Sequence, residues 1–231
     1  MKKALFLTLL VCSSSLFAQT LVLEEKAWQV KESKAFKGLD NYTHTFASLG
    51  FMAADQNTSF QVGGSYNFNF GFRYVNGLTS FYGMGVGFQY DFFSYRKGNE
   101  DEGVLSQSGL DITKESIQLD ELSLEWINRI RLGKSGTRLG YFLDLGLYGA
   151  RTVGATAMAE YTPNRYGGSG EISQKDLNFA YRWNYGLTAR LGMHRYVIFV
   201  KYRLSESFKS NAPFSDELPE LTFGFQLGLH N

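Results

Sequence analysis

The chain has 231 residues, a formal net charge of +1 and 16% aromatic residues, with 25 glycines but only 3 prolines. The balanced charge excludes a basic nucleic-acid-binding face, and the abundance of Phe and Tyr excludes a largely disordered chain. This composition favours many strands, and an all-β chain of this length often forms one domain.

Residues 1–18, MKKALFLTLLVCSSSLFA, have the pattern of a secretory signal peptide. Lys2 and Lys3 precede a short apolar core, and the small residue Ala18 closes the segment. We therefore expect cleavage after Ala18 and export of the mature chain.

Cys12 is the only cysteine and raises an alternative, a lipoprotein that is modified at this residue. Val11 is an unfavourable residue before a lipidated cysteine, and Leu16 and Phe17 would then stand near the start of the mature chain. Signal cleavage is therefore favoured. Beyond the signal no run of about 18 apolar residues occurs, so no transmembrane helix is predicted.

Residues 19–41 are charged and lack clean alternation, which predicts a periplasmic N-terminal segment. From residue 42 to residue 231 apolar and polar residues alternate with a period of two, which predicts strands. The pattern is clearest from Phe60 to Phe93, where Asn76 and Gly77 mark a tight turn between two long arms. Strands are expected at residues 42–52, 59–75, 79–95, 117–132, 139–152, 178–191, 196–206 and 219–229.

The connections between these strands alternate between short and long after the first one. The long ones are residues 96–116, 153–177 and 207–218. This alternation is typical of outer-membrane barrels, which have short periplasmic turns and long extracellular loops. We therefore predict an all-β fold, a transmembrane up-and-down antiparallel β-barrel of about eight strands at residues 42–231.

Which face of each strand points outward follows from the two environments of the barrel wall, lipid outside and a lumen inside. The aromatic face is expected to contact lipid, and the face rich in Gly, Asn and Gln is expected to line a narrow lumen. Aromatic residues near strand ends, among them Phe60, Tyr181 and Trp183, are expected in the interfacial girdles. A soluble barrel is the alternative, but its small interior could not hold so many aromatic side chains.

Charged residues on the inward face are predicted to fill the lumen as an ion-paired network, because charges screened from lipid must pair or stay hydrated. A gate or a narrow ion path is the alternative. The predicted network comprises Arg73, Asp91, Glu121, Glu125, Arg129, Arg131, Asp144, Arg182, Arg190, Lys201 and Arg203.

The loops hold the candidate contact residues. They are Glu100, Asp101, Glu102, Tyr161, Arg165 and Tyr166, because exposed aromatic residues beside Arg are contact-prone and acidic clusters attract cations. Alternation continues from Thr152 to Tyr161, so the strand there is expected to extend beyond the membrane.

Three histidines, His44, His194 and His230, are the only candidates for acid–base catalysis. Enzymes of small outer-membrane barrels need a histidine with a serine or carboxylate partner, and no strand carries a His-x-Ser pair. No cluster of His or Cys has the spacing of a metal site. We predict a non-enzymatic protein with no cofactor and no metal.

Three stretches carry a resemblance to a known family: the signal ending FAQ, the alternation YGMGVGFQYDFF, and the final strand LTFGFQLGL. Residues 42–231 resemble eight-stranded outer-membrane barrels of the OmpA/OmpX type, and more closely the PorT-like barrels of Bacteroidota. PorT is linked to type IX secretion, but no residue here carries that role over. The chain ends in Asn231 rather than in the aromatic residue usual for such barrels, and Phe225 is its last aromatic residue.

The expected role is a structural or accessory subunit of a larger outer-membrane or secretion assembly, located in the cell outer membrane. Its expected partners are outer-membrane lipid or lipopolysaccharide and another outer-membrane protein, but not nucleic acid. One alternative is a surface adhesin or ligand-binding barrel that acts through residues 96–116 and 153–177. The other is a narrow channel.

Overall fold

The computed structural model describes the part of the chain that carries the strands. All of it belongs to the second of two units, Lys37–Asn231. The predicted signal peptide and residues 19–40 of the predicted N-terminal segment lie outside the described residues. The described ranges are 41–53, 60–61, 64–97, 105, 112–132, 140–161, 170–210, 212 and 218–229.

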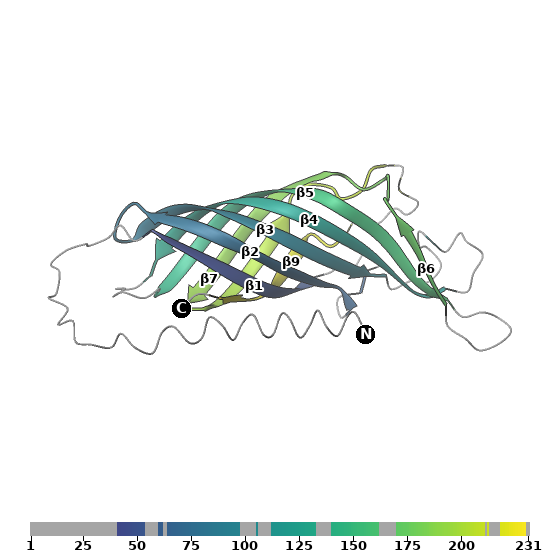
Figure 1. Ribbon diagram of the computed structural model, residues 1–231, viewed down its shortest axis with the longest axis horizontal. Coiled ribbons are helices and arrows are strands. Elements are labelled where there is room, and N and C mark those ends of the chain that lie inside the picture. The colour runs from purple at the N-terminus through teal and green to yellow at the C-terminus, as the bar shows by residue number, and fades with distance from the viewer. Residues whose placement is uncertain are drawn as a thin grey trace, which may run out of the picture. The chain divides into compact units, whose positions relative to one another are not determined.

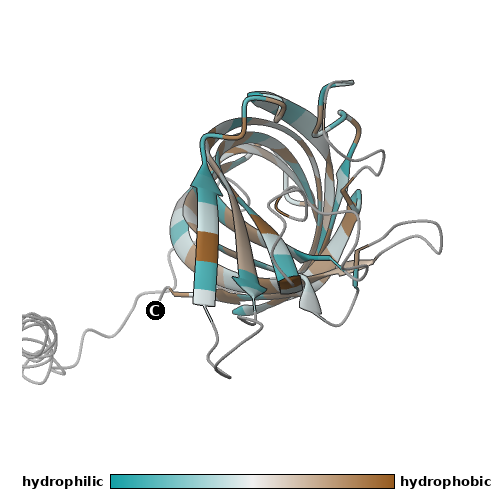
Figure 2. Cartoon of the chain, turned by 90° about the vertical axis from the view of Figure 1, so that its right-hand side faces the viewer, coloured by the Kyte–Doolittle hydropathy of each residue, from teal (hydrophilic) through white to brown (hydrophobic). Residues whose placement is uncertain are grey.

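Nine strands occur within these ranges, and eight of them close an antiparallel barrel (Figures 1 and 2). Around the barrel the order is β4-β3-β2-β1-β9-β8-β7-β5, and pairing of β4 with β5 closes the ring. The ninth strand, β6, pairs with β5 outside the ring. The strands are β1 (Tyr42–Ala53), β2 (Tyr66–Gly77), β3 (Tyr82–Arg96), β4 (Ile112–Arg131), β5 (Tyr141–Tyr161), β6 (Gly170–Lys175), β7 (Trp183–Met193), β8 (Tyr196–Arg203) and β9 (Leu221–Gly228).

The barrel has the facing of a membrane protein rather than of a soluble one. On β2, Phe68, Phe70 and Phe72 are about half exposed on the outer face, whereas Asn69 and Arg73 are buried inside. A soluble barrel would bury such an aromatic row, but in lipid it is the row that should face outward. Among the described residues no helix is long and apolar enough to cross a membrane. The predicted fold class, a transmembrane β-barrel of eight strands, is confirmed.

The two ends of the barrel differ in their connections. At one end, here the turn end, residues 78–81, 132–140 and 194–195 join successive strands. At the other, the loop end, the connections are residues 54–65, 97–111, 162–182 with β6, and 204–220. The alternation predicted from the sequence is therefore present. That the turn end faces the periplasm stays a prediction.

Some strand limits differ from the prediction. β2 begins at Tyr66 rather than at residue 59, and β4 begins earlier than expected, at Ile112. The predicted extension to Tyr161 is confirmed in β5, but β6 lies in a stretch predicted as loop. Its sequence, GEISQK, has only one large apolar residue, so alternation gave no strand signal.

A β-bulge changes the facing of β5 at the loop end. Asp120 pairs with Gly154 but Glu121 pairs with Thr152, so Val153 is the extra residue of β5. On the turn-end side of the bulge the even-numbered residues of β5 point inward, and on the loop-end side the odd-numbered residues point inward. The small residues Ala155, Ala157 and Ala159 are buried there.

The interior therefore has two zones, a charged one in the barrel and a hydrophobic one at the loop end. Phe60 belongs to the hydrophobic zone, is only 4% exposed and bridges Lys97, so its prediction as a girdle residue was wrong. Before β2 the chain stays beside the end of β3, because Gln61 N donates to the Arg96 carbonyl at 2.8 Å, and Phe60 belongs to the interior packing. The hydrophobic zone contains Met52, Phe60, Phe93, Tyr95, Leu105, Ile112, Ile117, Leu119, Ala155, Ala157, Ala159, Leu177, Phe179, Ala180, Phe208 and Leu218.

Candidate functional site

Arg129 and Asp144 form the ion pair nearest the turn end. They are register partners on β4 and β5, so their inward side chains lie side by side. Arg129 Nε donates to Asp144 Oδ1 at 2.5 Å and Nη2 donates to Oδ2 at 2.6 Å. The guanidinium lies 3.8 Å from the centre of the Phe142 ring. Both charged side chains are at most 2% exposed, so this pair is held away from water.

Glu125 is the centre of a second cluster, whose residues come from four strands, β2, β4, β7 and β9. Arg190 donates to both of its carboxylate oxygens, at 2.6 and 2.8 Å, and Thr188 donates to the same carboxylate. Arg73 Nε lies 3.7 Å from Glu125 Oε2, while its Nη1 donates to Gln226 Oε1 at 2.8 Å. One carboxylate thus contacts two arginines, and its negative charge is shared between them.

Asp91 forms a third cluster closer to the loop end. Lys201 Nζ lies 3.1 Å from Asp91 Oδ2, and Ser123 Oγ donates to the same oxygen at 2.7 Å. Gln89 donates to both oxygens of Asp91. Lys201 Nζ also lies 4.3 Å from the centre of the Tyr148 ring, which adds a cation–π contact.

Glu121 and Arg203 lie where the charged zone meets the hydrophobic zone. Asn184 donates to Glu121 Oε1 at 2.5 Å, and Arg203 Nη2 donates to the Leu218 carbonyl at 2.6 Å. A cavity of about 10 Å³ beside Lys201 is lined by both charged residues. That volume is roughly the space of one water molecule, so side chains fill this part of the interior.

Nine of the eleven residues of the predicted network are buried inside the barrel: Arg73, Asp91, Glu121, Glu125, Arg129, Asp144, Arg190, Lys201 and Arg203. Arg131 has the inward parity of β4 but is half-buried at the turn end. Arg182 requires a correction, because it is exposed on the outer surface. β7 begins only at Trp183, so Arg182 precedes the barrel wall and does not follow its alternation.

The predicted loop contacts are only partly described. Glu100, Asp101, Glu102, Arg165 and Tyr166 lie outside the described residues. Tyr161 is the last residue of β5, and its ring covers Gly170 on β6, its register partner.

Two buried charges at the loop end were missed by the sequence reasoning. Lys97 and Glu115 are 6% and 4% exposed, and both lie within segments that were predicted as loop. The backbone nitrogen of Lys97 donates to the Glu115 carbonyl, and Leu105 donates to the Glu115 carboxylate. Ile117 and Leu119 alternate with polar residues on β4. If this alternation is continued back by two residues, Glu115 falls on the inward face.

The histidines and acidic residues show no arrangement typical of a catalytic or metal site in the described part of the chain. His44 is buried inside β1, 6.2 Å from the Phe46 ring, and His194 has a positive φ in the turn between β7 and β8. His230 lies outside the described residues. Within the described ranges no group of three His, Cys, Asp or Glu residues could hold a metal ion.

Comparisons with known proteins assign the chain to no family. No family model matches the chain, and no curated protein matches it. Ail, the attachment invasion locus protein of Yersinia pestis, is similar over 83% of this chain and 95% of its own, at 15% identity and a TM-score of 0.35. Ail in complex with the heparin analogue sucrose octasulfate is similar over 83% and 96%, at 16% identity and a TM-score of 0.27.

Similarity this low decides neither fold nor function, so the fold class stands on the strand pairing and the facing of the wall. The resemblance to PorT-like barrels stays a prediction. The buried acidic groups of the interior accept hydrogen bonds from adjacent strands and from strands across the lumen, and they bind these strands to one another.

Proposed function

We propose that the protein is a non-enzymatic outer-membrane barrel that anchors a docking platform and serves as an accessory subunit of a larger outer-membrane or secretion assembly. The platform consists of the loop-end part of β4 (from Ile112), the part of β5 that ends at Tyr161, and β6. Figure 1 shows β4, β5 and β6 reaching beyond the other strands at that end.

The observation that carries this proposal is the free edge of β6. β6 is the last strand of its sheet and pairs only with β5 among the described strands. Most of its side chains are exposed. An exposed sheet edge can accept a strand from another protein, and main-chain hydrogen bonds then give the affinity.

The filled interior favours an anchor over a transporter. Bidentate pairs and aromatic contacts occupy the charged zone, and the hydrophobic zone covers it at the loop end. In lipid a strand can span only within a closed barrel, and the signal-like N-terminus predicted from the sequence supports export to the outer membrane. The turn end would face the periplasm and the platform the cell surface.

The test is the mass of the complex that carries the protein in its native membrane. The chain is tagged at its C-terminus, the membranes are extracted in mild detergent, and the eluate is analysed by native mass spectrometry. The β6 variant Glu171→Lys/Gln174→Lys places repulsive charge on the edge, and Thr79→Lys at the turn end is the matched control. Both sites are exposed.

A stoichiometric protein partner that is retained by the control and lost by the β6 variant supports the proposal. A lone species at the mass of this chain in wild-type membranes contradicts it. Tyr161 at the platform tip favours a second candidate, a surface ligand-binding barrel, which predicts that the lone species binds surface polysaccharides through this platform.

A further inference from the structure

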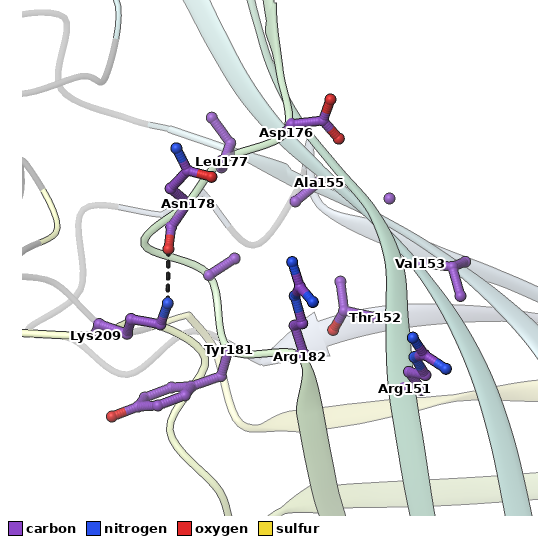
Figure 3. Close-up of a pocket in the computed structure, with 12 residues that line it drawn as sticks. Arg151, Thr152, Val153, Ala155, Asp176, Leu177, Asn178, Tyr181, Arg182 and Lys209 are labelled. Carbon is purple, nitrogen blue, oxygen red and sulfur yellow. Dashed lines mark hydrogen bonds between the residues drawn. The ribbon is translucent and has the colours of Figure 1, made fainter.

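A hollow of about 530 Å³ opens on the outer wall where β5 changes its neighbour (Figure 3). On the turn-end side of the hollow β5 pairs with β7 as far as Arg151 and Trp183. On the loop-end side β5 pairs with β6 from Thr156 and Lys175. Between these ladders only Leu177 and Arg182 keep a backbone hydrogen bond to β5, to Ala155 and Thr152, and residues 178–181 depart from it. The bulge at Val153 and this departure together make the hollow.

The hollow is lined by more positive than negative side chains. Arg151, Arg182 and Lys209 line it together with one acid, Asp176, and all four are exposed. In Figure 3 the Arg182 side chain extends between Asn178 and Thr152. It has no hydrogen bond or ion pair with another side chain among the described residues. Lys209 Nζ donates to the Asn178 carbonyl at 2.8 Å and has further N–H groups to donate.

The depth of the hollow in the membrane follows from the outer face of β4. Leu122 and Leu124 are exposed and apolar, but Asp120, the next outward residue toward the loop end, accepts a hydrogen bond from Tyr90 at 2.5 Å. The apolar wall therefore ends between Leu122 and Asp120. Arg151 is the register partner of Leu122, so it lies at this boundary.

Aromatic residues mark the same boundary. Trp183 is 68% exposed, and the Arg151 guanidinium lies 5.9 Å from its ring centre. Tyr181 also lines the hollow. Trp and Tyr concentrate at the level of lipid headgroups, where phosphate groups are found. A cationic hollow at that depth meets lipid phosphate before any soluble anion.

We propose that Arg151, Arg182 and Lys209 bind the phosphate group of a membrane lipid in the leaflet on the loop-end side. In this arrangement Arg182 donates from inside the hollow, Arg151 from the wall on its turn-end side, and Lys209 from the connection between β8 and β9. Guanidinium groups suit this ligand because they can donate two parallel hydrogen bonds to phosphate oxygens. This inference needs the membrane-spanning barrel but not the docking role of the platform.

The test uses the full mature chain in a neutral detergent and native mass spectrometry with three probes. The probes are lipid A with two phosphates, the same lipid without phosphate, and inorganic phosphate. For Arg151→Gln/Arg182→Gln we expect the affinity for phosphorylated lipid A to fall about tenfold or more, because charge-assisted hydrogen bonds are lost. Lys175→Gln, an exposed cation at the loop end that does not line the hollow, is the matched control.

Three results would overturn the proposal: an unchanged affinity in the double variant, equal binding of phosphate-free lipid, or full competition by inorganic phosphate, which would assign the hollow to a soluble anion. Folding of each variant is checked by its heat-modifiable mobility in gels. Should the double variant not fold, Arg182→Gln alone carries the test, since this exposed side chain supports no other described side chain.

Discussion

Glu125 and Arg190 form a bidentate ion pair across β5, which separates their strands β4 and β7 in the barrel wall. β5 contributes Gly146 at this level. A Cβ at this glycine would lie 2.5 Å from both Glu125 Oε1 and Thr188 Oγ1. The missing side chain of Gly146 is what leaves room for the carboxylate to reach Arg190.

Gly146→Ala is therefore expected to lower the free energy of unfolding by about 1–3 kcal/mol, because its methyl group displaces the Glu125 carboxylate. The measurement is urea unfolding in detergent micelles. Gly149→Ala on the same strand is the matched control, since a Cβ there meets nothing within 4 Å. Equal losses in the two variants would contradict this role of Gly146.

The Arg129–Asp144 pair should show strong coupling. Arg129→Met alone leaves a buried carboxylate without its bidentate partner, which is expected to cost about 3–5 kcal/mol of unfolding free energy. The double variant Arg129→Met/Asp144→Leu should recover a large part of this loss, because both buried charges are gone. A double-mutant cycle of unfolding measures the coupling, and additive losses would contradict a direct ion pair.

Most of the barrel could be predicted from the sequence because lipid imposes a simple rule on the wall: outward side chains are apolar and inward side chains are polar or small. Phe68, Phe70 and Phe72 had to face outward, and Asn69 and Arg73 inward, so period-two alternation alone indicated both the strands and the charged interior. The pairing of Glu125 with Arg190 could not be predicted, because these residues are brought together by barrel closure and by the space at Gly146.

The rule fails where the chain leaves the membrane. Arg182 lies before β7 and is exposed, although strand parity alone had placed it inside. Val153 reverses the facing of β5 through one extra residue, and nothing in its side chain marks a bulge. Toward the loop end Phe60 follows the packing of the hydrophobic zone, in which distant segments meet.

The limit of the apolar wall can be tested on one strand. Leu124 and Gln118 both lie on the outer face of β4, but Leu124 is within the apolar wall and Gln118 is beyond Asp120. Leu124→Arg is expected to lower the free energy of unfolding in lipid by about 1–3 kcal/mol, because a cation on the lipid face costs about 2–4 kcal/mol at the bilayer midplane and less toward the interface. Gln118→Arg should be nearly neutral. Similar losses would contradict a membrane boundary between them.

Deleting Val153 should remove the bulge and leave the loop end folded. Thr152 would still pair with Glu121 and Gly154 with Asp120, so Ala155, Ala157 and Ala159 stay on the inward face. We expect the loop-end connections to resist protease as in the wild type. Deleting Thr156 instead moves the following residues by one position, so Ala157 and Ala159 turn outward, and should give fast proteolysis with the heat-modifiable mobility of the barrel retained. Equal protease resistance of the two deletions would contradict Val153 as the extra residue.

The most direct measurement of the ion-paired interior is current through planar lipid bilayers that contain the purified mature protein. We expect no discrete conductance from the wild type, because Arg73, Arg129 and Arg190 are buried in pairs that fill the barrel. Stable unit currents that change in Arg129→Ala would contradict the filled interior and would make the protein a narrow channel.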